Sequence, residues 1–187
     1  MELKYAEHRG VIRTGDFAFF RGRRLYARLI QMRTCSVFSH VGIFVWIGHG
    51  ATQRLSIIEA MEGRGVQLLP CSCILTRDGS VDWYRLNARP ADGFEIDREA
   101  VAGFAMRQWG RRYASVWQFF RSFGFSIPKF FGGPADTDPD RYFCSELAAE
   151  ALAAGGYRDP EINVPAGCAP EVISRLACLQ RRGVLVP

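Results

Sequence analysis

The sequence contains no long apolar segment, at its start or elsewhere. No stretch of the chain approaches the roughly 18 consecutive apolar residues that a membrane-spanning helix requires. The first ten residues, MELKYAEHRG, also have no apolar core of the kind found in secretory signals. We therefore expect a soluble protein that remains in the cytoplasm.

Internal repeats, low-complexity tracts and long polar linkers are absent as well. Each would be a reason to divide the chain, because repeats stack as separate units and polar linkers separate domains. The composition, 48% hydrophobic and 23% charged, is that of an ordinary globular protein with one sizeable core. The sequence therefore predicts a single domain over residues 1–187 and leaves the oligomeric state open.

A strong charge imbalance is also missing. The chain has 24 basic and 19 acidic residues, a formal net charge of +5. The basic side chains form only small clusters, at residues 21–24, 111–112 and 181–182. This excess is too small and too dispersed to indicate nucleic-acid binding. It is compatible with an anionic substrate or with peripheral contact with an anionic membrane surface.

The six cysteines include no Cys-x-x-Cys pair of the kind that structural zinc sites commonly use. Cys71 and Cys73, with His49 and Cys35, could furnish four zinc ligands. However, Cys35 and His49 lie at the two ends of a predicted strand, too far apart to chelate one ion. The high hydrophobic content also removes the need for disulfides to stabilise the core. We therefore expect reduced thiols, no metal and no cofactor.

The first half of the chain has strand patterns and the second half has helix patterns. A turn at Gly15-Asp16 precedes an aromatic strand, and residues 23–33 have helical spacing of apolar side chains. β-Branched and aromatic runs separated by glycine-containing breaks then predict an antiparallel meander, over residues 37–47, 56–61, 65–70 and 81–86. Apolar spacing of three and four residues predicts helices over residues 97–110, 112–123, 141–156 and 169–183. Strands followed by helices indicate an α+β fold, an antiparallel sheet packed against helices.

His40 is the first residue that could carry chemistry. In a strand over residues 37–47, alternation puts the aliphatic side chains on one face, and we expect that face to be buried. That face comprises Val37, Val41, Ile43, Val45 and Ile47. His40 lies on the other face with Gly42, whose missing side chain leaves room for a substrate or a helix beside the imidazole. The alternative is a histidine that merely fills a sheet surface.

Glu59 lies in an apolar run, flanked by Ile57, Ile58 and Met61. Burying a carboxylate without a partner costs several kcal/mol, so we expect Glu59 to have a polar or charged partner. If the glycines around residue 48 close a hairpin, Glu59 pairs near Gly42 and shares the face of His40. It could then accept the second imidazole N–H and orient the ring. The alternative is an edge-strand glutamate in water.

Cys144 lies where a helix is expected to begin. Residues 138–140, Asp-Pro-Asp, are start signals for a helix that continues to Gly155 and Gly156. The positive end of that helix and a nearby imidazolium would favour the thiolate form of Cys144. The buried stripe of this helix would be Leu147, Ala148, Ala151 and Leu152, while Glu146 and Glu150 would face solvent. A structural cysteine that packs as a small hydrophobe is the alternative.

The order of these motifs resembles a known clan. The chain has Thr14-GD-F, then FSHVGI, then IIEA followed by GV, and finally YFCSEL before an alanine-rich helix. This order is similar to that of the circularly permuted papain-like proteins. They include NlpC-type cell-wall amidases, lecithin retinol acyltransferases and, most similar over residues 14–155, the YiiX-like hydrolases. The resemblance implies a permuted papain-like fold in which the tail from residue 165 corresponds to a closing helix.

The resemblance also implies roles for the three residues. Cys144 would be the nucleophile, His40 the base, and Glu59 the residue that orients the base, while Asp16 would only form a turn. The helix that carries Cys144 would pack on the His40 face of the sheet. We expect a cysteine-dependent hydrolase that acts on an amide, ester or thioester. An acyltransferase of the lecithin retinol acyltransferase kind and a non-catalytic ligand-binding relative are the alternatives.

An aromatic segment over residues 117–131 precedes the nucleophile motif. Core packing is the common explanation for such residues, and an apolar lid or acyl-chain groove is the functional one. Basic residues flank the segment, at Arg111, Arg112, Arg121 and Lys129. The expected partner is therefore a small-molecule, peptide or lipid-like acyl substrate, with a lipid-like ester or acylated peptide favoured.

Overall fold

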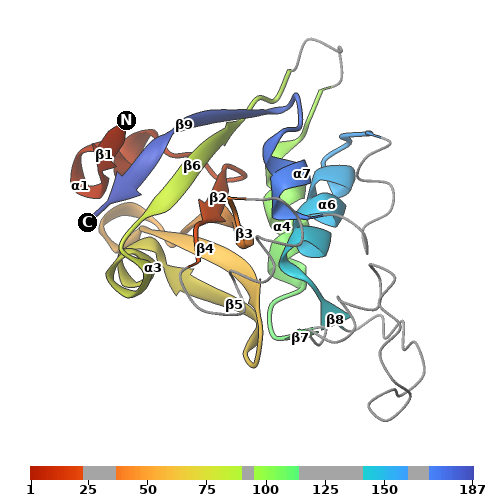
Figure 1. Cartoon of the computed structure of the whole chain (residues 1–187), viewed down its shortest axis with the longest axis horizontal. Coiled ribbons are helices and arrows are strands. Elements are labelled where there is room, and N and C mark those ends of the chain that lie inside the picture. The colour runs from red at the N-terminus through yellow and green to blue at the C-terminus, as the bar shows by residue number, and fades with distance from the viewer. Residues whose placement is uncertain (23–36, 90–94, 114–140, 160–168) are drawn as a thin grey trace.

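The computed structural model describes residues 1–22, 37–89, 95–113, 141–159 and 169–187 (Figure 1). A seven-stranded sheet forms its centre, with the strand order β1-β9-β6-β2-β3-β4-β5. Neighbouring strands are antiparallel except β1 and β9, which are parallel. The strands are β1 (Glu2–Lys4), β2 (Phe17–Phe20), β3 (His40–Ile47), β4 (Arg54–Met61), β5 (Gly65–Pro70), β6 (Val81–Leu86) and β9 (Leu179–Val186). A short parallel pair, β7 (Arg112–Tyr113) and β8 (Arg141–Tyr142), lies beside it.

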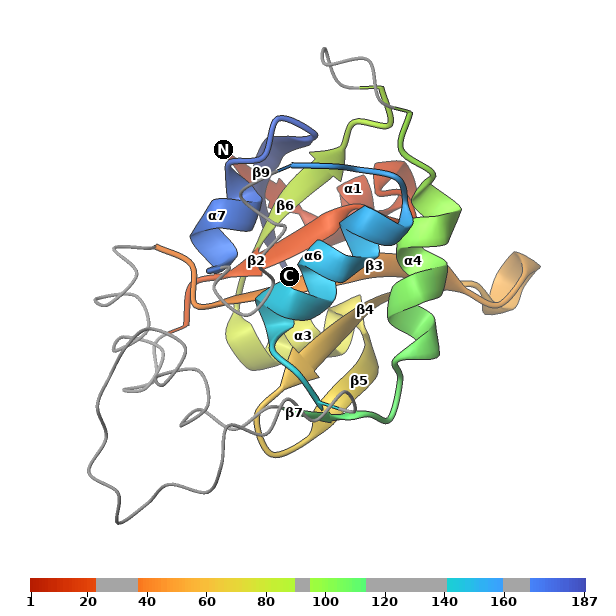
Figure 2. The ribbon, with the colours of Figure 1, turned by 90° about the vertical axis from the view of Figure 1, so that its right-hand side faces the viewer.

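Helices cover both faces of the sheet. Figure 1 shows α4 (Arg98–Arg107), α6 (Cys144–Ala154) and α7 (Pro170–Ser174) on one side, and α3 (Cys71–Asp78) on the other. Figure 2 shows α7, α6 and α4 side by side over the face that they cover. The short helices are α1 (Tyr5–His8), η1 (Arg9–Val11) and η2 (Gly50–Thr52). One core cluster joins α4, α6 and α7 to the sheet, and a second joins α3 to the opposite face. Strands and helices on both faces confirm the predicted α+β class.

The predicted meander is correct for three strands and wrong for the fourth. Strands β3, β4 and β5 pair in succession, as the glycine-containing breaks indicated. Strand β6 does not join β5, because α3, which the sequence analysis did not predict, carries the chain away from that edge. β6 pairs instead with β2 and β9.

The C-terminal segment differs from its prediction. Residues 169–183 were expected to form a helix, but α7 ends at Ser174 and residues from Leu179 onward form strand β9. Strand β9 lies between β1 and β6 and pairs with both, and its residues Leu179 and Leu185 are buried. Backbone pairing to two strands therefore overrides the helical spacing seen in the sequence.

Two of the predicted helices cannot be compared. The helix over residues 23–33 and most of the helix over residues 112–123 lie outside the described residues. The predicted strand over residues 37–47 begins three residues late, at His40, and Val37 is exposed rather than buried. The predicted helix over residues 97–110 appears as α4, with Asp97 capping its first turn through hydrogen bonds to two backbone N–H groups.

Asp16 does more than form a turn. It is completely buried and anchors the start of β2 to β6 and α4. Its carboxylate accepts hydrogen bonds from Trp83 Nε1 at 2.9 Å, from the backbone N–H of Leu86 at 3.1 Å, and from Arg98 Nη1 at 2.7 Å. A buried carboxylate with this many donors is a structural anchor.

Candidate active site

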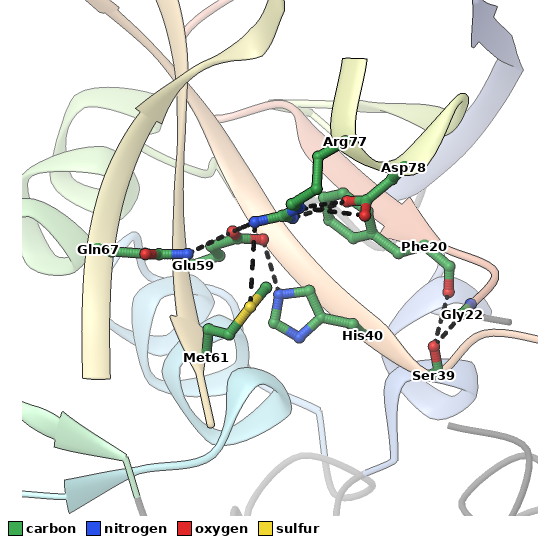
Figure 3. A network of polar contacts seen from close by, with 9 residues as sticks. All are labelled: Phe20, Gly22, Ser39, His40, Glu59, Met61, Gln67, Arg77 and Asp78. Carbon is green, nitrogen blue, oxygen red and sulfur yellow. Dashed lines mark hydrogen bonds and ion pairs between the residues drawn. The ribbon is translucent and has the colours of Figure 1, made fainter. Parts of the chain in front are cut away.

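His40 begins strand β3, and its ring points toward strand β4 (Figure 3). The Nε2–H group donates to Oε2 of Glu59 across a distance of 2.8 Å. This pairing follows from the register, in which Glu59 lies opposite Gly42 and therefore shares the face of His40. The predicted register and the predicted imidazole–carboxylate contact are both present.

Glu59 is completely buried, and its charge is compensated on every side by donors. Besides His40, the Nε2 atom of Gln67 on β5 donates to its Oε1 atom at 2.9 Å. Arg77 on α3 donates through Nη1 to the same oxygen at 3.2 Å. Burial alone would raise the pKa of Glu59, but the hydrogen bond and charge of His40, with Arg77 and Gln67, lower it to about 2. Glu59 is thus an ionised group at neutral pH, and not an edge-strand residue in water.

Gly42 has a different role from the one expected. Its missing side chain was predicted to leave room for a substrate or a helix. A Cβ atom there would lie 2.7 Å from Cγ2 of Ile57 and 3.3 Å from Cβ of Glu59, both on the neighbouring strand. Strand β4 already fills the space, so the glycine permits close approach of β3 and β4 at Glu59.

Cys144 is the first residue of α6, directly after the N-cap residue Phe143. The helix therefore begins later than the start signals at residues 138–140 indicated, because Arg141 and Tyr142 form strand β8. The Cys144 side chain is buried, and its interaction with the His40 ring raises the pKa of the imidazole. Since Glu59 occupies Nε2 of the ring, Nδ1 is the nitrogen available to the sulfur.

The helix packs on the opposite face of the sheet from the one expected. The α6 stripe of Leu147, Ala148, Ala151 and Leu152 is buried as predicted, in the cluster that contains the odd-numbered β3 residues. The even-numbered residue Phe44 belongs to the cluster under α3. His40 and Cys144 nevertheless meet because each begins its element.

The charge state of His40 follows from its position between two acidic partners. Burial lowers the pKa of the imidazole, but the Cys144 sulfur and the Glu59 carboxylate raise it to about 10. The arrangement therefore favours an imidazolium that faces the sulfur on one side and a carboxylate on the other. The Phe20 ring, 5.1 Å from the His40 ring between centroids, packs against it.

Neither Glu146 nor Glu150 simply faces solvent. Glu146 Oε2 accepts a hydrogen bond from the backbone N–H of Phe143 at 3.2 Å and so closes the helix start. Burial raises the pKa of Glu146. Glu150 Oε2 accepts from the hydroxyl of Tyr142 at 3.0 Å. Both carboxylates tie the helix to the chain that precedes Cys144.

No group of three or more metal-ligating side chains that could hold an ion occurs among the described residues. Cys35 of the alternative zinc set lies outside them. Cys71 is buried under the sheet, and burial raises the pKa of its thiol to about 12. In the same described part of the chain, no helix is long and apolar enough to cross a membrane.

Sequence reasoning missed Gln67 and Arg77. The contact of Gln67 could have been predicted, because a three-residue turn over residues 62–64 joins two predicted strands and puts Gln67 opposite Glu59. Arg77 lies on α3, whose Cys-Ser-Cys start was considered only as a zinc motif. A buried carboxylate that needs compensating charge was the one signal for such a cation.

Comparison with known proteins identifies the family of the chain and a similar fold. Residues 11–165 match the family model described as permuted papain-like amidase enzyme, YaeF/YiiX, C92 family. The chain belongs to this family. The crystal structure of metalloprotein yiiX from Escherichia coli O157:H7 has a similar fold, with a TM-score of 0.63 and 20% sequence identity. The similarity covers 94% of this chain and 98% of that chain. The search of curated proteins found no match.

Membership confirms the resemblance seen in the sequence and the permuted papain-like fold. Along the chain, the strand that begins with His40 comes first, and helix α6, which begins with Cys144, follows. The family places the chain among cysteine hydrolases of the amidase type.

Proposed function

We propose that this chain is a thiol-dependent amidase in which Cys144 attacks an acyl carbon. The observation that carries the proposal is the alignment of a buried, ionised Glu59, the His40 ring and the Cys144 side chain. A carboxylate behind an imidazole, with a thiol in front of it, is the arrangement that nucleophilic acyl transfer requires. Among acyl groups the amide is favoured, because the family consists of amidases.

Each residue has a distinct task in the proposed reaction. The Cys144 sulfur forms a bond to the carbonyl carbon of the substrate, and the carbonyl oxygen takes the negative charge. The His40 imidazolium then gives its proton to the leaving amine as the C–N bond breaks. Glu59 holds the ring and stabilises its positive charge. Water, deprotonated by the neutral imidazole, releases the acyl group from the sulfur as a carboxylic acid.

The start of α6 offers backbone N–H groups that can donate hydrogen bonds to the substrate oxygen that becomes negatively charged. The first backbone N–H groups of a helix have no acceptor within the helix. The first hydrogen bond within α6 at this end runs from the N–H of Leu147 to the carbonyl of Phe143. The N–H group of Cys144 itself is therefore a suitable donor to an oxyanion formed beside its own sulfur.

The proposal is tested by trapping the acyl intermediate. An activated acyl amide is mixed with the wild-type protein and with Cys144→Ala and His40→Ala, and the protein mass is followed. We expect one acyl adduct on Cys144, released with time as free acid, and turnover abolished in both variants. Cys71→Ala is the matched control, since its buried thiol lies under the other face, and it should acylate normally. Turnover that survives in Cys144→Ala would overturn the proposal.

The same assay distinguishes the remaining alternatives. An acyltransferase would form the adduct but pass the acyl group to an added amine or alcohol faster than to water. A binding relative would form no adduct. The preference for an apolar acyl group rests on the aromatic residues 117–131, which lie outside the described residues, and it stays a prediction.

A further inference from the structure

Arg77 connects the candidate site to the surface of α3. Its Nη1 atom donates to Oε1 of Glu59 at 3.2 Å, while Nη2 and Nε donate to the carboxylate of Asp78 at 2.6 and 3.0 Å. The guanidinium therefore spans two carboxylates, one buried and one at the surface (Figure 3). Its side chain is 26% exposed, so most of it lies within the protein.

The two oxygens of Glu59 have separate partners. Oε2 receives the His40 N–H, and Oε1 receives both Gln67 and Arg77. If the carboxylate turned, it would lose hydrogen bonds at both oxygens, so the two donors at Oε1 fix the position of Oε2. The orientation of the imidazole thus depends on residues that do not touch it.

The charges along this line alternate in sign. Asp78 is negative, Arg77 positive, Glu59 negative and His40 positive, and each contacts the next in the described part of the chain. Arg77 contributes to the lowered pKa of Glu59, after His40. The line ends at the sulfur, and its members in order are Asp78, Arg77, Glu59, His40 and Cys144.

We propose that Arg77 is a positioning residue whose guanidinium, held by Asp78, fixes Glu59 and thereby holds the His40 imidazolium against Cys144. This inference rests on the proposed function of the site. A lysine could contact Glu59 or Asp78, but its single point charge cannot bridge both as the planar guanidinium does. Residues that hydrogen-bond the histidine ligands of metal sites are commonly worth about 10-fold to 100-fold in activity, and we expect an effect of that order here.

A second effect of Arg77 acts in the opposite direction. Its positive charge repels the imidazolium, so loss of the charge alone would make the imidazolium of His40 more stable. Loss of the bridge would let Glu59 turn and would make it less stable. The sign of the change in Cys144 reactivity therefore separates positioning from a simple charge effect.

The test is the rate of alkylation of Cys144 by iodoacetamide between pH 5 and pH 9, read for each cysteine by mass spectrometry. It needs no substrate. In Arg77→Gln we expect the Cys144 rate at pH 5 to fall about 10-fold and to approach the wild-type rate near pH 9. Cys73, exposed on the same helix, is the internal control and should react at the wild-type rate. A Cys144 rate at pH 5 equal to or above wild type would overturn the inference.

Two further variants make the test complete. Arg181→Gln is the matched control, because Arg181 also binds a buried carboxylate, that of Asp82, but lies on β9, three strands from β3. Its profile should be that of the wild type. If Arg77→Gln does not fold, Arg77→Lys is used in its place. We expect its rate of Cys144 alkylation at pH 5 to lie between those of the wild type and Arg77→Gln. The full wild-type rate in Arg77→Lys would overturn the inference. If wild-type Cys144 itself shows no rapid reaction at pH 5, it is the proposed function that fails.

Discussion

Gly42 on β3 lies directly opposite Glu59 on β4, and an added Cβ atom would come within 3.3 Å of the Glu59 Cβ. It would also meet Cγ2 of Ile57 at 2.7 Å, in a fully buried part of the sheet. The distance between these strands at the candidate site is therefore set by a residue with no chemistry of its own.

We expect Gly42→Ala to lower the free energy of unfolding by about 1 to 3 kcal/mol, the usual cost of overpacking a core. Urea denaturation followed by tryptophan fluorescence measures it. Gly103→Ala in α4 is the control, because its added Cβ would meet only the flexible end of Arg107 at 3.5 Å. Alanine should stabilise that helix by up to about 1 kcal/mol. Equal effects at the two positions would contradict this explanation of Gly42.

Glu59→Gln should keep the fold and part of the activity, whereas Cys144→Ala and His40→Ala should have none. The amide oxygen can still accept the imidazole N–H, but it carries no charge to stabilise the imidazolium. Because Glu59 and Cys144 together raise the pKa of His40 to about 10, activity that needs the imidazolium is present below that pH and lost above it. In Glu59→Gln the alkaline limb of kcat/KM should move to lower pH.

The control for that experiment is Asp97→Asn, which changes the N-cap residue of α4. The alkaline limb of kcat/KM should not move in this variant. An unchanged limb in Glu59→Gln would show that the carboxylate does not set the charge of His40. Complete loss of activity, equal to that in Cys144→Ala, would instead mean that Glu59 takes a direct part in the reaction.

The sequence predicted the parts of the site that depend on local pattern. Alternation gave the strand of His40, and hairpin pairing gave the contact with Glu59. What it could not give was the direction in which α6 approaches. That depends on which sheet face the longer helices cover, a long-range choice that no local pattern contains. For the same reason the C-terminal strand was taken for a helix, since its partners β1 and β6 are distant in sequence.

Arg77 and Asp16 illustrate a second limit. Alternation of polar and apolar residues does not reveal their partners. Arg77, on a helix that was not predicted, contacts Glu59. Asp16 accepts hydrogen bonds from donors on β6 and α4. Buried charge can be recognised in a sequence as a need for compensation. Which residue supplies the compensation is decided by packing.

Asp16→Asn should destabilise the protein by about 3 kcal/mol or more, because it leaves the Arg98 cation without its anionic partner in a buried site. Thermal and urea unfolding measure the loss. Asp97→Asn is the matched control, since asparagine caps a helix about as well as aspartate, and its effect should be near zero. Folded Asp16→Asn should retain the wild-type pH profile of Cys144 alkylation. A changed profile would give Asp16 a part in the site that its contacts do not indicate.

The last prediction concerns stability in acid. The folded-state pKa of Glu59, about 2, lies below its ordinary value of 4.5 because the contacts with His40, Arg77 and Gln67 outweigh the cost of burial. Its ionised form therefore stabilises the fold fully above about pH 4.5, and that stabilisation is lost as the pH falls toward 2. A shift of this size corresponds to about 3 kcal/mol. The raised pKa of His40 is not added to it, since that rise is due first to Cys144 and then to the same contact with Glu59.

The measurement is the free energy of unfolding in urea at several pH values from 3 to 7, in the wild type and in Glu59→Gln. Titration of the other carboxylates is common to both proteins and cancels in the difference. We expect the difference to be largest near neutral pH, to begin falling near pH 4.5 and to keep shrinking to pH 3. A difference that stays constant over this range would mean that Glu59 is not ionised in the folded protein, and the imidazolium of His40 would then lack the charge that holds it beside Cys144.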